Sequence, residues 1–128
     1  MPPTRTDRQI AGDVAEDAAC EHLLASGCQL LARNVRFRVG ELDLVMLDGK
    51  TLVFVEVRMR RDDRFGGAMS SVDFSKRRKF ARAAQAWLST HTKMAQSPCR
   101  FDVVAVVPGT DGLHCDWLRG AFTMDDVG

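Results

Sequence analysis

The order of hydrophobic periodicities predicts an α/β protein of the α+β kind, with a mixed β-sheet flanked by helices. Apolar residues recur at helical spacing over 7–26 and again over 73–90, and three strand-like segments lie between these helices. A continuous apolar run at 101–107 follows and predicts a buried strand, and 113–118 predicts an added edge strand. The predicted order is therefore helix, three strands, helix, strand and a short β tail.

The first helix has recognisable ends. Thr6 to Gln9 fits a capping box, and Gly27 provides a stop. Glu16 lies away from the stripe formed by Ile10, Val14 and Ala18 but above Ala19, Cys20 and Leu23. It therefore either edges the domain surface or points into a cleft. Residues 28–38 then predict the first strand.

The segment 40–58 predicts a β-hairpin. Asp48-Gly49, between two aliphatic runs, is a strong signal for a two-residue turn and places Leu47 opposite Lys50. Because side chains alternate between the faces of a strand, this register gives one apolar face and one mixed face. The apolar face holds Leu42, Leu44, Met46, Val53, Val55 and Val57, and the acids lie on the other face with Val45, Leu47, Leu52 and Phe54.

Three carboxylates gather at the open end of this hairpin. The register places Glu41 across from Glu56, with Asp43 diagonal to Glu56. Carboxylates brought together repel one another unless one is protonated or a cation neutralises them. Such oxygen ligands suit Mg²⁺ or Mn²⁺, whose remaining positions can take phosphate oxygens, and this indicates phosphodiester hydrolysis. The alternative is a set of ion pairs in which Glu41 and Glu56 meet Arg58 or Arg38.

The second half of the chain predicts a loop, a basic helix and a connector. Residues 60–72 contain Gly66-Gly67 and two serines, which is typical of a loop that approaches a ligand. Asp73 caps the following helix, whose inner stripe contains Phe80 and Trp87. These two aromatic residues predict core anchors rather than base-stacking platforms. Residues 92–99 predict a connector.

Length and composition predict one globular domain over residues 1–128, with residues 1–6 disordered. The chain has no run of eighteen apolar residues and no signal-peptide pattern, so we expect a soluble, cytoplasmic protein without a membrane partner. The four cysteines lack paired spacing, which favours buried reduced thiols over disulfides or structural zinc. The three histidines likewise show no metal or catalytic spacing.

The net charge of +1 hides a strong asymmetry. Residues 58–100 hold eleven Lys and Arg against three acids, a net charge of +8, and the rest of the chain carries −7. A basic segment that begins at the end of the acid-bearing strand favours contact with a nucleic acid. The alternative is a solvated helix face beside a charged loop.

Asp43 and Glu56, with a cation two residues after the second acid, resemble the pattern of the PD-(D/E)xK nuclease superfamily, here ending Glu56-Val57-Arg58. More of the chain is similar to the small bacterial YraN family, over most of residues 10–107. The matching positions are Gly12, Glu16, Asn34, Gly40 to Asp43, Phe54 to Val57, Arg60, Gly66, Lys76 and Arg100 to Asp102. The resemblance implies a restriction-endonuclease-like αβββαβ core, akin to archaeal Holliday junction resolvases.

The resemblance also implies roles for single residues. Asp43 and Glu56 would hold Mg²⁺ or Mn²⁺ with the Val57 carbonyl, and Glu16 would approach from the first helix. Glu41 would be an auxiliary acid. In related nucleases a lysine at position 58 orients or activates the attacking water, and here Arg58 can stabilise phosphoryl oxygens but cannot act as a general base. The water must therefore be activated by metal.

These observations favour a metal-dependent endonuclease acting on branched or otherwise structured DNA. Its nucleic-acid contacts would come from Arg60, Arg61, Arg64, Lys76, Arg77 and Lys79. One alternative is a nucleic-acid-binding module of nuclease fold without turnover, and another is a protein-interaction scaffold. Cutting a two-fold junction would require a homodimer.

Overall fold

Five strands form one mixed sheet in the order β1-β2-β3-β4-β5, which confirms the predicted fold class. The structure, a computed structural model, describes the backbone of residues 7–59 and 74–123 and the side chains of 12–59 and 75–123. The predictions for residues 1–6, for the whole loop 60–72 and for the Asp73 cap lie outside the described residues. The elements are α1 (Asp7–Ala25), β1 (Gln29–Phe37), β2 (Gly40–Asp48), β3 (Thr51–Met59), α3 (Phe74–Thr90), η1 (Thr92–Met94), β4 (Cys99–Gly109) and β5 (Gly112–Phe122).

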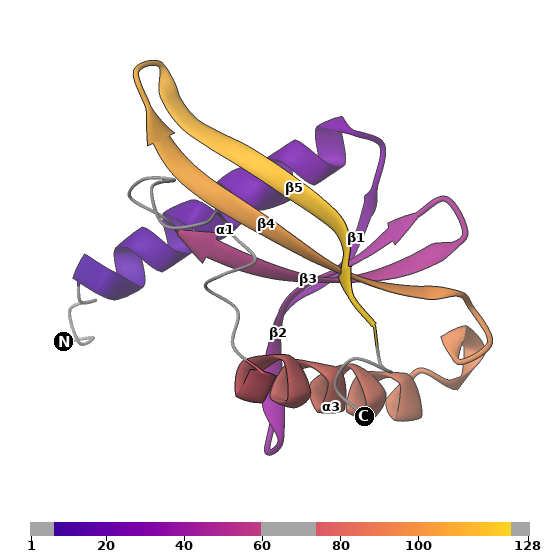
Figure 1. Cartoon of the computed structure of the whole chain (residues 1–128). Coiled ribbons are helices and arrows are strands. Elements are labelled where there is room, and N and C mark those ends of the chain that lie inside the picture. The colour runs from indigo at the N-terminus through magenta and orange to yellow at the C-terminus, as the bar shows by residue number, and fades with distance from the viewer. Residues whose placement is uncertain (1–6, 60–73, 124–128) are drawn as a thin grey trace, which may run out of the picture.

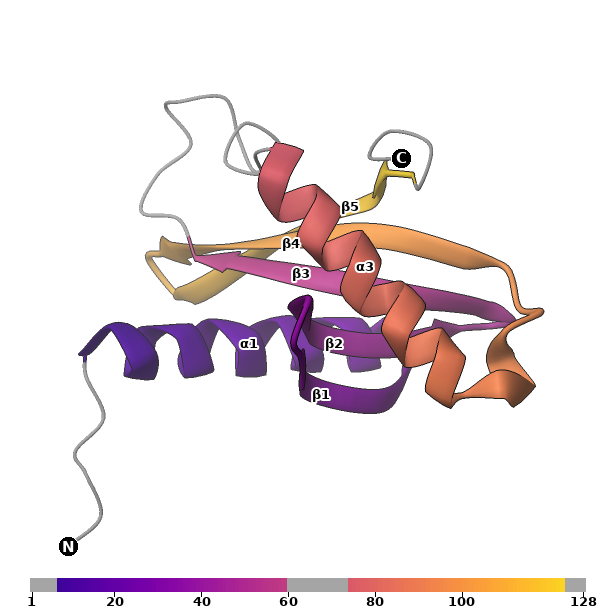
Figure 2. The same ribbon diagram turned by 90° about the horizontal axis from the view of Figure 1, so that it is seen from below.

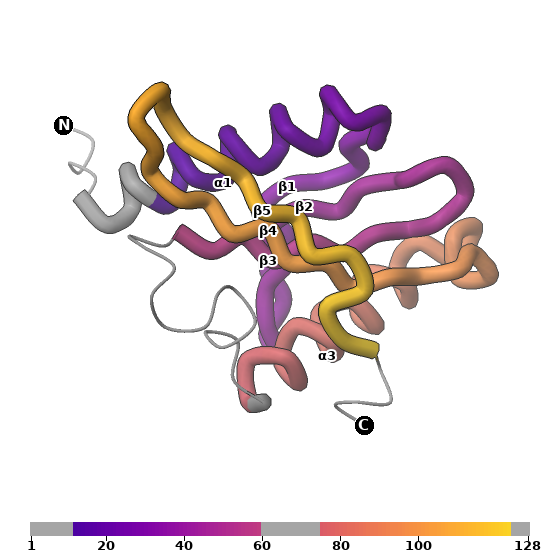
Figure 3. Tube along the Cα trace, turned by 45° about the horizontal axis from the view of Figure 1, so that its top comes forward, coloured from indigo at the N-terminus to yellow at the C-terminus, as the bar shows by residue number. Residues whose placement is uncertain are grey.

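Three neighbouring strand pairs are antiparallel, and the pair β3·β4 is parallel. A parallel pair needs a crossover connection, and α3 lies within that connection. Figure 1 shows α1 behind β4 and β5, and α3 along the lower side of the strands. Figure 3 traces the chain from the end of α3 through η1 into β4. The element order predicted from periodicity is therefore confirmed.

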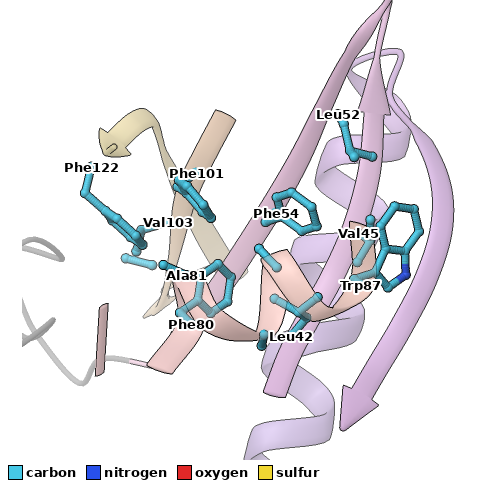
Figure 4. Packing of buried hydrophobic residues seen from close by; sticks show 13 residues of the cluster. Leu42, Val45, Leu52, Phe54, Phe80, Ala81, Trp87, Phe101, Val103 and Phe122 are labelled. Atoms are coloured by element: carbon cyan, nitrogen blue, oxygen red, sulfur yellow. The ribbon is translucent and has the colours of Figure 1, made fainter. Parts of the chain in front are cut away.

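The larger core lies between α3 and the sheet (Figure 4). Phe80 and Trp87 of α3 are buried there, which confirms their prediction as core residues. The rings of Phe54 and Phe101 stack with centroids 5.7 Å apart, and Phe101 stacks on Phe122 at 5.0 Å. Trp87 contacts the Phe54 ring at 5.9 Å between centroids, and Phe80 contacts Phe101 at 6.0 Å and Phe122 at 6.1 Å, so aromatic contacts tie α3 to strands β3, β4 and β5.

A second core lies between α1 and the other face of the sheet. Figure 2 shows α1 running along the strands and α3 crossing them at a steep angle. Ala15, Ala19 and Leu23 are buried in this core, whereas Val14 is 45% exposed. The stripe that faces the sheet therefore runs along Ala15, Ala19 and Leu23, which belong to the apolar spacing that predicted the helix, and leaves Val14 outside it.

The hairpin turn is shifted by one residue from its predicted position. Asp48 pairs with Thr51, and Leu47 faces Leu52 rather than Lys50. Gly49 takes a φ of +62°, so the turn residues are Gly49 and Lys50. Glycine accepts a positive φ at the first position of a tight hairpin turn without the steric cost that Asp48 would incur, and this decides the register.

The cysteines are partly as the sequence predicts. Cys20 and Cys28 are buried and all four cysteines are free, as predicted. Cys99 is exposed and Cys115 is half-buried, contrary to the expectation of buried thiols. Cys99 begins β4 ahead of the buried run 101–106. The three histidines, His22, His91 and His114, are all exposed. Neither helix in the described parts of the chain has the length and apolar character needed to cross a membrane.

The tip of the β1–β2 hairpin packs closely against α3 at Gly40. A Cβ atom added to Gly40 would lie 2.5 Å from the backbone oxygen of Lys79. The contact is with backbone, which cannot rotate aside as a flexible side chain can. Glycine at this position therefore lets the hairpin approach the helix.

We predict that Gly40→Ala lowers the free energy of unfolding by about 1–3 kcal/mol, because the hairpin must move away from α3. Urea denaturation measures the change. Gly12→Ala is the matched control, since a Cβ at Gly12 meets nothing within 4 Å and its helical position favours alanine. A Gly40→Ala protein as stable as Gly12→Ala would contradict the close contact.

Candidate functional site

The β1–β2 hairpin changes direction at Asn34 and Asp43, and this creates the site. Register pairs Arg33↔Leu44 and Val35↔Leu42 leave Asn34 opposite Asp43. Asn34 has a φ of 51°, a left-handed conformation that asparagine tolerates better than most residues. In Figure 1 the hairpin turns away from β3 and runs down past α3.

The same change separates β2 from β3. Their pairing extends from Asp48↔Thr51 only to Leu44↔Val55. Beyond it, Leu42 packs in the α3-side core, whereas Leu44 packs in the α1-side core. The sequence-based prediction that both share one face is therefore wrong, because the strand twists at Asp43. We call this opening between β2 and β3, around Asp43 and Val57, the fork.

Asp43 spans the fork. Its Oδ2 accepts a hydrogen bond from the backbone N–H of Val57 at 2.8 Å, in the place where a continued ladder would bring Leu42. Burial raises the pKa of Asp43 to about 7, the Val57 hydrogen bond opposes the rise, and the nearby charges of Glu56, Glu16 and Glu41 add to it. The carboxyl is thus held in a partly buried site that penalises its own negative charge.

Glu56 and Arg58 form an ion pair on β3 beside Asp43. Arg58 Nη2 lies 2.7 Å from Glu56 Oε1, and the two side chains are 18% and 13% exposed, respectively. Arg58 Nε and Nη2 are both buried and make no hydrogen bond within the described residues, so the contact with Glu56 is an ion pair without hydrogen-bond geometry. This pair agrees with the ion-pair alternative drawn from the sequence for Glu56. The guanidinium thus supplies a positive charge at the acid that was predicted to hold metal.

Glu16 points inward from α1 rather than along the surface. It is 7% exposed, and Arg33 reaches its Oε1 with both Nε and Nη2 at 3.1 Å. The same Nη2 donates to Asp17 Oδ1 at 2.7 Å. Arg33 sits across from Leu44 on the next strand. The ion pair therefore fixes α1 to β1 and holds Glu16 near the fork.

Two grooves meet at Asp43. The basic groove, on the α3 side, has a volume of about 560 Å³, and the acidic groove, on the α1 side, about 620 Å³. The basic groove is lined by Arg36, Phe37, Arg38, Val39, Gly40, Glu41, Asp43, Glu56, Arg58, Lys76, Lys79 and Phe80. The acidic groove is lined by Gly12, Asp13, Ala15, Glu16, Asn34, Arg36, Glu41, Asp43, Val57 and Met59.

The structure brings most of the predicted catalytic residues together, but with a different arrangement. Glu41 is exposed and pairs with Arg36 at 3.4 Å. It does not lie across from Glu56 as predicted. When the β2·β3 register is continued by one pair, Asp43 faces Glu56 instead. The one-residue shift of the turn accounts for this correction.

The predicted nucleic-acid-binding residues divide into three sets. Lys76 and Lys79 line the basic groove. Arg77 does not line it and lies over the Phe122 ring, 5.6 Å from the centroid. Arg60, Arg61 and Arg64 lie outside the described residues.

The carboxylate and carbonyl oxygens at the fork are of the kind that hard divalent cations prefer as ligands. Asp43 and Glu56 come from adjacent strands, and the Val57 carbonyl belongs to the same backbone segment. Mg²⁺ commonly uses one or two protein carboxylates and completes its shell with water and phosphate. Within residues 12–59 and 75–123, no three His, Cys, Asp or Glu side chains gather closely enough to hold a metal. The fit therefore rests on two carboxylates, with Glu16 outside the immediate donor set.

Comparison with known proteins identifies the family. Residues 15–106 match the Uncharacterised protein family UPF0102. A UPF0102 protein of Xanthomonas campestris pv. campestris (strain B100) is 54% identical over 119 residues, which cover 93% of this chain and 96% of that protein. The chain belongs to the UPF0102, or YraN, family. The resemblance to the YraN family noted in the sequence is confirmed.

A second curated relative also matches over nearly its whole length. A UPF0102 protein of Stutzerimonas stutzeri (strain A1501) is 50% identical over 117 residues, covering 91% of this chain and 98% of the relative. The crystal structure of SSO0001 matches over 95% of this chain and 57% of the other, at 12% identity and a TM-score of 0.42. That similarity is too weak to support a statement about fold or function.

The sequence interpretation missed several residues of the site. Arg36 was not named, and Arg38 was considered only as an ion-pair partner of the acids, because the charge count drew attention to the segment after Arg58, yet both line the basic groove. Their positions on either side of the last β1 residue, just before Gly40, were the available signal, since the hairpin brings this segment beside the acids. Arg33 was missed because its partner Glu16 is seventeen residues away.

Asp102 is a second buried acid, and its hydrogen-bond partners stabilise its charge. It is 0% exposed and accepts bonds from Arg100, Trp117 Nε1 at 2.7 Å and the Gly120 amide at 2.9 Å. Its charge is thus matched by an arginine and by donors from β5. Asp43 receives no such guanidinium bond within the described residues, which distinguishes the two acids.

We predict that Asp43→Asn stabilises this UPF0102 protein above neutral pH. The folded-state pKa of about 7 exceeds the ordinary value of 3.8, so the folded state binds the proton more tightly between these pH values and the wild type loses stability as pH rises. Asparagine avoids the buried charge and can still accept the Val57 hydrogen bond. The expected gain is about 2–3 kcal/mol at pH 8, shrinking to little at pH 4.

Urea denaturation at several pH values in chelator measures this difference. Asp111→Asn, an exposed change in the β4–β5 turn, is the matched control and should show no comparable pH-dependent gain. Equal pH profiles for wild type and Asp43→Asn would show that the carboxyl is not held in a charge-penalising site.

Proposed function

We propose that this protein is a metal-dependent endonuclease-like protein that binds branched or structured DNA and hydrolyses its phosphodiesters. The observation that carries the proposal is the basic groove, in which Asp43 and Glu56 lie among cations from three elements. Arg36 and Arg38 come from the β1–β2 hairpin, Arg58 from β3, and Lys76 and Lys79 from α3. Carboxylates beside cations at one groove suit a metal together with a phosphate.

The charge of α3 supports an anionic ligand. Basic residues fill the start of this helix, which has no acidic residue in its first turn. The helix macrodipole already places partial positive charge there, so these cations are unfavourable for the isolated helix. A bound phosphate backbone would offset both the dipole and the side-chain charges.

The residues at the fork have separable roles in the proposed reaction. When bound, Mg²⁺ or Mn²⁺ would lower the pKa of a water and stabilise the leaving oxygen. Asp43 is oriented by the Val57 amide, and Glu56 by Arg58. A guanidinium keeps its positive charge in water, so Arg58 can donate to a phosphoryl oxygen but cannot take the water's proton. Lys79 and Lys76 would neutralise neighbouring phosphates.

We predict that the purified protein nicks or cuts branched, flapped or single-stranded DNA with Mg²⁺ or Mn²⁺, and that Glu56→Gln abolishes this activity by removing an acid from the metal's donor set. Gel analysis of a labelled substrate panel measures cleavage. Glu21→Gln, an exposed change on α1 outside the basic groove, should cut like wild type. If wild type and Glu56→Gln leave every substrate equally intact, the enzymatic proposal is wrong.

The ion pair between Arg58 and Glu56 favours a second candidate, a DNA-binding module without turnover. At 2.7 Å the guanidinium already neutralises Glu56, so a metal must compete with it. In that case DNA binding would persist in Asp43→Asn while no substrate is cut under any metal condition. The cleavage experiment and a binding measurement on Asp43→Asn separate the two candidates.

Both candidates predict that the double variant Lys76→Gln/Lys79→Gln binds DNA more weakly. Loss of up to two phosphate contacts should reduce the slope of log K against log salt by up to about 2, because fewer counterions are released. Fluorescence anisotropy across a salt series measures this slope. Lys50→Gln/Lys93→Gln removes equal charge from exposed positions outside the groove and should change the slope less. Equal slopes for the two double variants would contradict the assigned DNA surface.

A further inference from the structure

The turn between β1 and β2 carries an exposed apolar side chain. It consists of Arg38 and Val39, and Val39 is 44% exposed. The two other hairpin turns, Gly49-Lys50 and Thr110-Asp111, contain glycine and polar residues instead. A β-branched apolar residue has no conformational advantage in a tight turn, where glycine, asparagine and aspartate are preferred. Its presence at this tip therefore calls for another explanation.

The tip stands on a firm base. Phe37, the last residue of β1, packs against the core beneath α3. Gly40, the first residue of β2, lies so close to the Lys79 backbone that a Cβ would not fit. Figure 1 shows the hairpin tip projecting beyond α3. A projection fixed on both sides keeps its shape when it meets a ligand, so little ordering is required on binding.

Cations flank the tip and the acids lie behind it. Arg36 and Arg38 are exposed, and both line the basic groove with Val39. Asp43 and Glu56 line the same groove, so the tip borders the proposed cleavage site. An apolar side chain between guanidinium groups matches the chemistry of a DNA step, in which stacked bases lie between phosphates. An acidic protein surface would satisfy the arginines but would leave Val39 without an apolar partner.

We propose that the Arg38-Val39 tip is a wedge that recognises branch points in DNA. Val39 inserts against an unstacked base step while Arg36 and Arg38 contact the flanking phosphates. Apolar wedges of this kind separate stacked bases, and the separation is easiest where stacking is already interrupted. The inference rests on the proposed function and deepens it, because it assigns the preference for branched DNA to one side chain.

Val39→Ser tests the wedge, and Val14→Ser is its matched control. Val14 is 45% exposed on α1 and does not line the basic groove, so the two variants make the same change at equal exposure. Affinities are measured by fluorescence anisotropy in chelator, for a four-way junction and for a linear duplex of equal length. We expect Val39→Ser to reduce the preference for the junction by roughly tenfold while its affinity for duplex stays near that of wild type. Val14→Ser should retain the full preference.

A 2-aminopurine placed at the branch point supplies a direct readout. Its fluorescence should rise when wild type or Val14→Ser binds, because the base unstacks, and should rise less with Val39→Ser. Arg38→Gln should instead weaken binding to junction and duplex alike, since a phosphate contact carries no information about branching.

The outcomes distinguish the wedge from the function on which it rests. If Val39→Ser keeps both the junction preference and the fluorescence rise while Glu56→Gln abolishes cleavage, the wedge is wrong and the nuclease proposal stands. If wild type binds neither DNA, both proposals fail. If wild type binds both DNAs equally, the wedge is wrong whatever the cleavage result.

Discussion

The hydrogen bond from the Val57 amide to the Asp43 carboxylate is the interaction on which the site depends. Where β2 leaves β3, the Val57 N–H loses its strand partner, and a buried amide without an acceptor would cost free energy. A carboxylate one residue from the expected partner satisfies it. The sheet can therefore open without an unsatisfied amide, and the side chain that closes the gap is drawn into both grooves.

The separation of β2 from β3 leaves Asp43 as a partly buried carboxylate whose charge opposes folding. Asp102 shows what a stable buried acid looks like, with an arginine and donors from two strands around it. Asp43 instead has one backbone donor and three acids nearby, and the resulting pKa of about 7 means that its charge opposes folding at neutral pH. Such an arrangement is typical of sites that bind a cation, since the cation removes the cost. Arg58 at Glu56 reduces the same repulsion from inside the protein.

The element order could be predicted from the sequence because it depends on local periodicity. Phe80 and Trp87 follow a helical stripe, and the buried run 101–107 admits few other interpretations. The hairpin register was harder, since a turn one residue earlier suits the same apolar pattern. What decided it was that Gly49 accepts a positive φ at the first turn position.

The geometry of the fork could not be predicted from local sequence patterns. Strict alternation places Leu42 and Leu44 on one face, but the left-handed Asn34 and the twist at Asp43 send them to opposite cores. Arg33 meets Glu16 only after α1 packs on the sheet. These contacts are set by how distant elements pack, so the acids at the site could be named from the sequence, whereas their partners could not.

The fold places the acidic and basic parts of the chain on opposite faces of the sheet. The acidic helix α1 and the basic helix α3 cover opposite faces of the sheet, and the grooves on these two sides share Asp43. Under the proposed function, a polyanion is attracted to the α3 side and repelled from the α1 side, so one face alone can receive the DNA. The β1–β2 hairpin carries Arg36, Arg38 and Val39 to that same face, because its change of direction at Asn34 and Asp43 points the tip toward α3. A single bend in the β1–β2 hairpin thus opens the fork at Asp43 and turns the hairpin tip toward the basic groove.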